Sequence, residues 1–97
     1  MSPLVPSPRL ERMVRRDFAG AADGALARLS SLRLARAEKQ DPERIQAAVA
    51  ILAAGDPERL ESAAGSAERD WRDVLVWSGL GNGDWRARLD EVLDREA

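Results

Sequence analysis

The chain lacks cysteine and histidine altogether, and it contains one lysine, one phenylalanine and no tyrosine. Without cysteine there is neither a disulfide framework nor thiolate chemistry. Without histidine there is no imidazole acid, base or metal ligand, and no simple pH switch near neutrality. We therefore expect no zinc site, no bound metal or other cofactor, and no catalytic residues, so that an enzyme is the class of function this composition disfavours most.

Long apolar runs are also missing. The longest purely apolar run, residues 47–54, is far too short to cross a bilayer. The first eight residues have neither the basic region nor the apolar stretch of a signal peptide. These features predict a cytoplasmic protein that does not contact a membrane.

What the chain does contain is typical of one globular domain: 97 residues, of which 44% are hydrophobic and 33% charged. The charge is unevenly spread. Residues 1–40 carry eight basic and four acidic side chains, whereas residues 41–97 carry seven basic and thirteen acidic ones. Either the two halves attract each other within the fold, or the molecule has a bipolar surface that recognises a partner or a second copy.

Helical periodicity dominates the sequence, and no segment alternates like a strand. We predict an all-α fold, a compact bundle of four to five helices, with residues 1–7 as a flexible tail and residues 8–97 as a single helical domain. Ser7 and Pro8 form the first helix start, and that helix is expected to end near residues 18–20. A second helix is expected from about Ala21 to Lys39, although its apolar stripe fades after Leu32, where it either bends or ends.

Two repeated start signals, Asp41-Pro42 and Asp56-Pro57, predict the third and fourth helices. The third is apolar nearly all round, which indicates a central helix, and Gly55 is its expected stop. The fourth is expected to reach about Ser78. A glycine-rich turn over residues 79–83 then separates it from a short last helix that carries Trp85, Leu89, Val92 and Leu93 on one face.

Val76 and Trp77 lie away from the main apolar stripe of the fourth helix, which runs from Leu60 to Leu75. Apolar side chains outside the main stripe are removed from water only if a second helix or another molecule covers them. Either the first or the final helix covers them, or they form an interface with a partner or a second copy, where tryptophan is a frequent anchor.

Asp70 and Asp73 precede these residues at a spacing that places them on one side of a continuous helix. Two neighbouring carboxylates could bind a divalent ion or act as acid and base. The adjacent Arg69 and Arg72 favour a salt-bridged surface instead, which could border the same interface. In the first helix, Asp17 falls within the apolar stripe, where it is expected to bond a neighbouring backbone group or pair with an arginine.

Arg9, Arg12 and Arg16 lie together on the first helix and form a possible basic patch for phosphates. Stacking aromatics are scarce and the second half is acidic, so we expect this patch to be an ordinary solvated surface.

The stretch from Arg44 to Leu75 carries an R-I-Q helix, an A-x-G-D turn and a closing D-W-R-D-V-L. In these features it resembles a pattern found in short hypothetical proteins of GC-rich actinobacteria, and it covers about a third of the chain. The resemblance implies a bacterial cytoplasmic origin and an isolated small domain, and it implies no activity.

We therefore expect a small helical protein-interaction module that binds a protein partner or self-associates into a homo-oligomer, and that does not bind nucleic acid. One alternative is a nucleic-acid-associated accessory protein that uses the N-terminal arginines. The other is an enzyme built on Asp70 and Asp73.

Overall fold

A computed structural model of the chain describes residues 4–37 and 39–94, and within them it contains helices and no strands. The all-α bundle predicted from the sequence is confirmed. In chain order the elements are α1 (Pro8–Phe18), the 3-10 turn η1 (Ala19–Ala21), α2 (Ala22–Ser30), α3 (Pro42–Ala53), α4 (Pro57–Ser78) and α5 (Trp85–Leu93).

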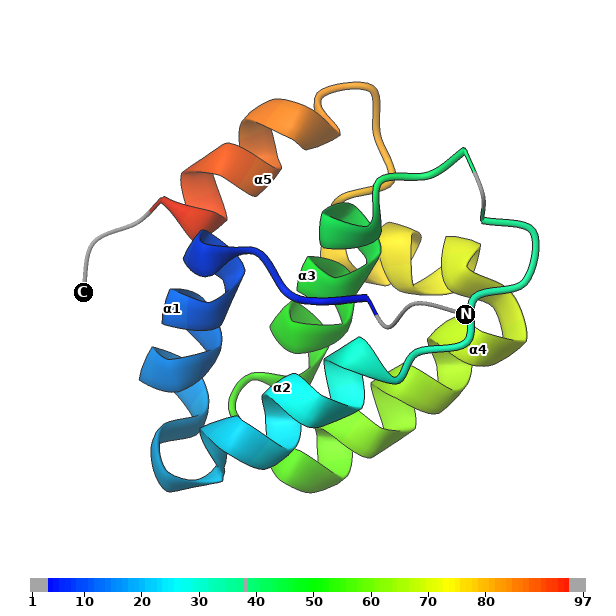
Figure 1. Cartoon of the computed structure of the whole chain (residues 1–97). Helices are drawn as coiled ribbons and strands as arrows, with labels where there is room; N and C mark the ends of the chain where they lie inside the picture. The colour runs from blue at the N-terminus through cyan, green and yellow to red at the C-terminus, as the bar shows by residue number, and fades with distance from the viewer. Residues whose placement is uncertain (1–3, 38, 95–97) are drawn as a thin grey trace.

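Helix α3 occupies the middle of the molecule, with α1, α2, α4 and α5 arranged around it (Figure 1). Its closest neighbour is α4, and small side chains line both helices where they meet, so that the two backbones approach closely. The prediction of a central helix is confirmed because α3 buries residues on most of its surface. These buried residues are Ile45, Gln46, Ala47, Ala48, Val49, Ala50 and Ala53.

Three helices start where the sequence predicted, and each start has the same physical cause. The Ser7 hydroxyl accepts a hydrogen bond from the Leu10 amide at 3.3 Å, and Pro8 occupies the first helical position. The carboxylates of Asp41 and Asp56 each accept a hydrogen bond, at 2.9 Å, from the amide two residues further on. Each of these side chains therefore satisfies an amide that the helix itself leaves without a partner.

Helix α2 ends at Ser30, so the prediction of a helix that reaches Lys39 is wrong. The Ser31 hydroxyl donates to the Arg28 carbonyl at 2.8 Å, and the chain then leaves the helix. This exit lets Leu32 enter the core. A continued helix would instead have placed Arg33 and Arg36 on the apolar face. The fading of the apolar stripe after Leu32 was the sequence signal for this end.

Residues 4–7, which the sequence assigned to a tail, lie against the bundle. The Leu4 amide donates to the Ser30 carbonyl at 3.1 Å. The Leu4 carbonyl accepts from the side-chain amide of Gln46 at 2.7 Å, and the same Gln46 amide donates to the Leu29 carbonyl at 3.1 Å. Gln46, only 1% exposed, thereby joins α3 to the end of α2 and to the N-terminal segment.

The helices within residues 4–37 and 39–94 include none that is both long enough and apolar enough to span a membrane.

Candidate functional site: the outer face of helix α4

Helix α4 is interrupted at Asp70, where the backbone adopts φ −158° and ψ 101°. The Asp70 carboxylate accepts a hydrogen bond from the Arg72 amide at 3.1 Å. This is the bond that Asp41 and Asp56 make at the starts of α3 and α4, so Asp70 caps a second helical segment that runs over residues 71–78. The prediction of a fourth helix that reaches about Ser78 is confirmed, and the kink at Asp70 is a feature that the sequence did not predict.

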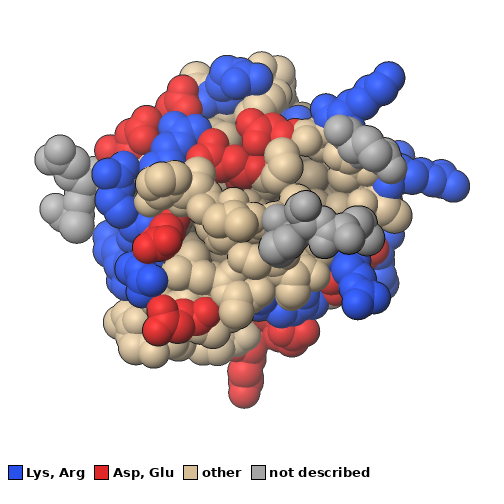
Figure 2. Space-filling model, viewed as in Figure 1, with Lys and Arg blue, Asp and Glu red and all other residues tan. Residues whose placement is uncertain are grey.

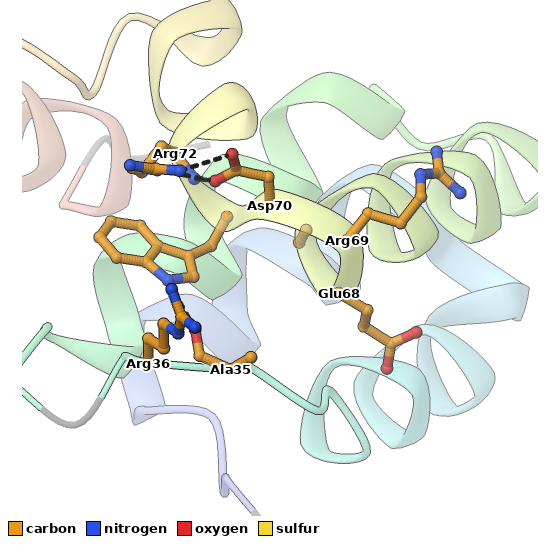
Figure 3. A pocket seen from close by; sticks show the side chains of 8 residues that line it. Ala35, Arg36, Glu68, Arg69, Asp70 and Arg72 are labelled. Carbon is orange, nitrogen blue, oxygen red and sulfur yellow. Dashed lines mark hydrogen bonds and ion pairs between the residues drawn. The ribbon is translucent and has the colours of Figure 1, made fainter.

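The Asp70 carboxylate is also held by the Arg72 guanidinium group, whose Nε and Nη2 lie 2.9 Å and 3.0 Å from its two oxygens (Figure 3). These hydrogen bonds, together with the bond from the Arg72 amide, lower the pKa of Asp70. Asp73 lies one turn further on and is exposed. The kink at Asp70 removes the regular helical spacing on which the predicted pairing of Asp70 with Asp73 depended. Among the residues that the structure describes, no three His, Cys, Asp or Glu side chains cluster as they would around a metal ion.

The loop between α2 and α3 is fastened to α4 on both sides of the kink. The Trp71 indole Nε1 donates to the Ala35 carbonyl at 3.0 Å. The Glu68 carboxylate accepts from the Arg33 amide at 3.0 Å and pairs with Arg28 of α2 at 2.9 Å. Hydrogen bonds from Arg28 and Arg33 lower the pKa of Glu68, so this carboxylate remains ionised.

Two hollows lie along this face of α4 and share Trp71 and Arg72. The first has a volume of about 580 Å³ between α4 and the loop, and Figure 3 shows Arg36 reaching into it from the loop side. It is lined by Ala35, Arg36, Ala67, Glu68, Arg69, Asp70, Trp71 and Arg72. The second has a volume of about 280 Å³ and is lined by Gln40, Arg44, Trp71, Arg72, Leu75, Val76 and Gly81. We call the two together the α4 groove.

Val76 and Trp77 lie at the end of α4, beside the second hollow. Their side chains are 70% and 61% exposed. No helix of the described chain covers them, so the expectation that α1 or α5 buries them is wrong. Among the described residues the only other large hydrophobic side chain with comparable exposure is Val5, in the N-terminal segment. The kink at Asp70 and the cap at Gly79, which has φ +84°, fix both ends of the segment that presents Val76 and Trp77.

The three arginines of the predicted basic patch are not equivalent in the structure. Arg9 forms two hydrogen bonds to Glu43 of α3 and further ion pairs, at 2.7 Å and 3.2 Å, with Asp90 and with Asp94 beyond α5. Arg16 pairs with Asp17 at 3.0 Å, as expected for Asp17, and Arg12 is exposed. Because these ion pairs link α1 to α3 and α5, the charge of Arg9 stabilises the fold.

Arg44 is a residue that the sequence did not single out. Its Nε and Nη2 donate to the Leu80 carbonyl at 2.9 Å and 2.7 Å, and its guanidinium lies 4.3 Å from the centre of the Trp85 ring. Burial lowers the pKa of Arg44. Arg86 also lies over the Trp85 ring, at 4.7 Å. Arg44 thus fixes the turn between α4 and α5, which forms one wall of the α4 groove through Gly81.

No known protein-family model matches this chain, and no curated protein or solved structure matches it either.

Proposed function

We propose that this protein is a small helical interaction module that binds a protein partner through the C-terminal segment of α4. The observation that carries the proposal is the pair Val76 and Trp77, two adjacent large apolar side chains that are mostly exposed at the end of a capped helix. Exposing them to water is unfavourable, and covering them on a partner recovers that free energy. Tryptophan is among the residues that contribute most to binding at protein interfaces.

The surroundings of Val76 and Trp77 support the same function. The segment that carries them is short, capped at Asp70 and Gly79, and anchored in the core through the buried side chains of Val74 and Leu75, so it needs little ordering on binding. The hollow beside it offers a place for a partner side chain. We place this function in the cytoplasm, in keeping with the lack of cysteine and of any membrane-spanning helix in the described chain.

The test is a comparison of wild-type protein with the double variant Val76→Ser/Trp77→Ser as baits in lysate of the native cell. Both baits should fold equally well because both side chains are exposed. We expect one or more stoichiometric proteins on the wild type that are lost on the variant, since removing a tryptophan anchor costs about 2 kcal/mol or roughly thirtyfold in affinity. Equal capture by both baits would contradict the proposal.

Self-association is measured on the same two proteins by sedimentation. A wild-type dimer that dissociates in the double variant would identify a second copy as the partner at this surface. A dimer that persists in the double variant would place self-association on another face of the molecule.

A further inference from the structure

The α4 groove combines positive charge with an apolar floor. Its charged lining residues are four arginines and two acids: Arg36, Arg44, Arg69, Arg72, Glu68 and Asp70. The space-filling view shows basic side chains projecting from the right-hand edge of the molecule, where α4 and the α2–α3 loop lie (Figure 2). Within the described residues, the fold neutralises some of these charges and leaves others without an ion-pair partner.

Both acids of the groove are already engaged. Glu68 pairs with Arg28, which lies outside the groove, and Asp70 is held by Arg72. Neither carboxylate faces Arg36 or Arg69 at ion-pair distance within residues 4–37 and 39–94. Arg69 donates only to the Ser66 hydroxyl, at 3.2 Å. Arg36 and Arg69 are therefore cations whose charge is not cancelled inside the described part of the fold.

Arg36 is held in this position by an uncommon backbone conformation. Its φ is +60°, in the left-handed region that a side chain such as arginine seldom adopts. The neighbouring carbonyl of Ala35 accepts a hydrogen bond from the Trp71 indole, which ties this part of the loop to α4. The consequence is a guanidinium group that lines the first hollow (Figure 3).

The apolar part of the groove adjoins the hollow that these cations line, because the two hollows share Trp71 and Arg72. Trp71, Leu75 and Val76 line the second hollow, and Trp77 follows immediately on α4. A volume of about 280 Å³ accommodates one bulky side chain. A ligand that fits both parts has carboxylates at one end and an aliphatic or aromatic side chain at the other.

We propose that the partner presents an acidic peptide segment with one bulky apolar side chain, and that the α4 groove is its docking site. The apolar side chain enters the second hollow beside Val76, and carboxylates of the segment meet Arg36 and Arg69. This inference rests on the proposed interaction function and names the chemistry of its partner. Charge complementarity favours this occupant, because Arg36 and Arg69 pair with no carboxylate within the described residues and carboxylates of an acidic segment would neutralise them.

Selection from a displayed library of short random peptides, with the full-length protein as bait, tests the proposal. We expect the selected peptides to be rich in Asp and Glu and to share a Trp, Phe or Leu. Affinities of synthetic copies are then measured by fluorescence anisotropy. Neutral or basic peptides, or a failure to select any peptide, would overturn the inference.

Substitutions of the two groove arginines test the role of charge. Arg36→Asn removes the charge while keeping a residue that tolerates positive φ, and Arg69→Gln removes the second charge on α4. Because each change removes one exposed ion pair with the peptide, we expect roughly tenfold weaker binding when both changes are combined, and a shallower salt dependence. The matched control is Arg59→Gln, an exposed arginine on α4 outside the groove, which should bind peptides like the wild type.

The same peptides measured on Val76→Ser/Trp77→Ser separate this inference from the proposed function. Binding lost in that variant but retained in the combined arginine variant overturns the acidic partner and leaves the interaction surface in place. Binding retained in Val76→Ser/Trp77→Ser but lost in the arginine variant contradicts the proposed surface itself. Displacement of the peptides by single-stranded oligothymidylate at equal concentration would assign the groove to nucleic acid and overturn the inference.

Discussion

The carbonyl oxygen of Asp17 lies only 2.4 Å from the point that a Cβ atom on Gly55 would occupy. The last turn of α1 therefore packs directly on the backbone of the α3–α4 turn, which is possible because position 55 has no side chain. Gly55 also has φ +82°, a conformation that costs a side chain energy even in open space.

Gly55→Ala is accordingly expected to destabilise the protein by about 2 kcal/mol or more, because the methyl group meets backbone that cannot rotate away. Urea unfolding measures the change. Gly83→Ala is the matched control, since nothing lies within 4 Å of a Cβ at that position and its φ is not in the left-handed region. Equal stabilities for the two variants would contradict the close approach of α1.

Gln46→Leu tests the buried polar connection between α3 and its neighbours. The substitution keeps the side-chain size but leaves the Leu4 and Leu29 carbonyls without their shared donor. We expect a loss of about 1–3 kcal/mol in the free energy of unfolding and faster amide exchange at Leu4. Unchanged stability would show that these carbonyls find other donors at no cost.

The ion pair between Arg9 and Glu43 predicts a pH dependence of stability. Hydrogen bonds from Arg9 and Ser7 lower the pKa of Glu43 below its ordinary value of 4.5. A group with a lowered folded-state pKa stabilises the protein above its unfolded pKa, and this contribution is lost as the pH falls through the folded value. The wild type should therefore lose stability below about pH 4.5 more steeply than Glu43→Gln.

At neutral pH, Glu43→Gln should cost about 1–2 kcal/mol, because the partly buried Arg9 loses the least exposed of its three charged acceptors. Glu11→Gln is the control, since Glu11 forms an exposed pair with Arg15 within α1 and its removal should change stability by about 0.5 kcal/mol at most. If the free energy of unfolding falls equally steeply below about pH 4.5 in the wild type and in Glu43→Gln, the claim that ionised Glu43 stabilises the fold is contradicted.

The kink in α4 predicts a difference between two substitutions at Asp70. Asparagine can still accept the hydrogen bond from the Arg72 amide, whereas alanine cannot. Asp70→Ala should therefore speed amide exchange over residues 71–78, and Asp70→Asn should leave it close to wild type. If amide exchange over residues 71–78 is accelerated equally in both variants, Asp70 acts through its charge alone.

The sequence predicted the parts of the fold that local rules determine. Ser7, Asp41 and Asp56 precede prolines and start helices where expected, because capping depends only on neighbouring atoms. The cap at Asp70 was missed because no proline follows it and the apolar stripe continues through Trp71. The early end of α2 depends on Leu32 entering the core. The apolar periodicity fades after Leu32, but it did not decide whether the helix ends there or bends.

The candidate site was only partly predictable for a related reason. The irregular position of Val76 and Trp77 on the helical wheel marked them as unusual, and the sequence left open whether another helix covered them. The groove beside them depends on the contact of Trp71 with Ala35, residues from different elements. The engagement of Arg9 by Asp90 and Asp94 likewise joins opposite ends of the chain, so no local pattern could reveal it.

Photo-crosslinking at position 73 tests the central claim, that the end of α4 is a binding surface, most directly. A benzophenone side chain replaces Asp73, which is exposed one helical turn before Trp77, in one sample and the exposed Arg12 of α1 in the other, and both full-length proteins are irradiated in the native cell. We predict a discrete covalent adduct, a protein partner or a second copy, at position 73 and none at position 12. Adducts at position 12 alone, or the same adducts at both positions, would contradict the account.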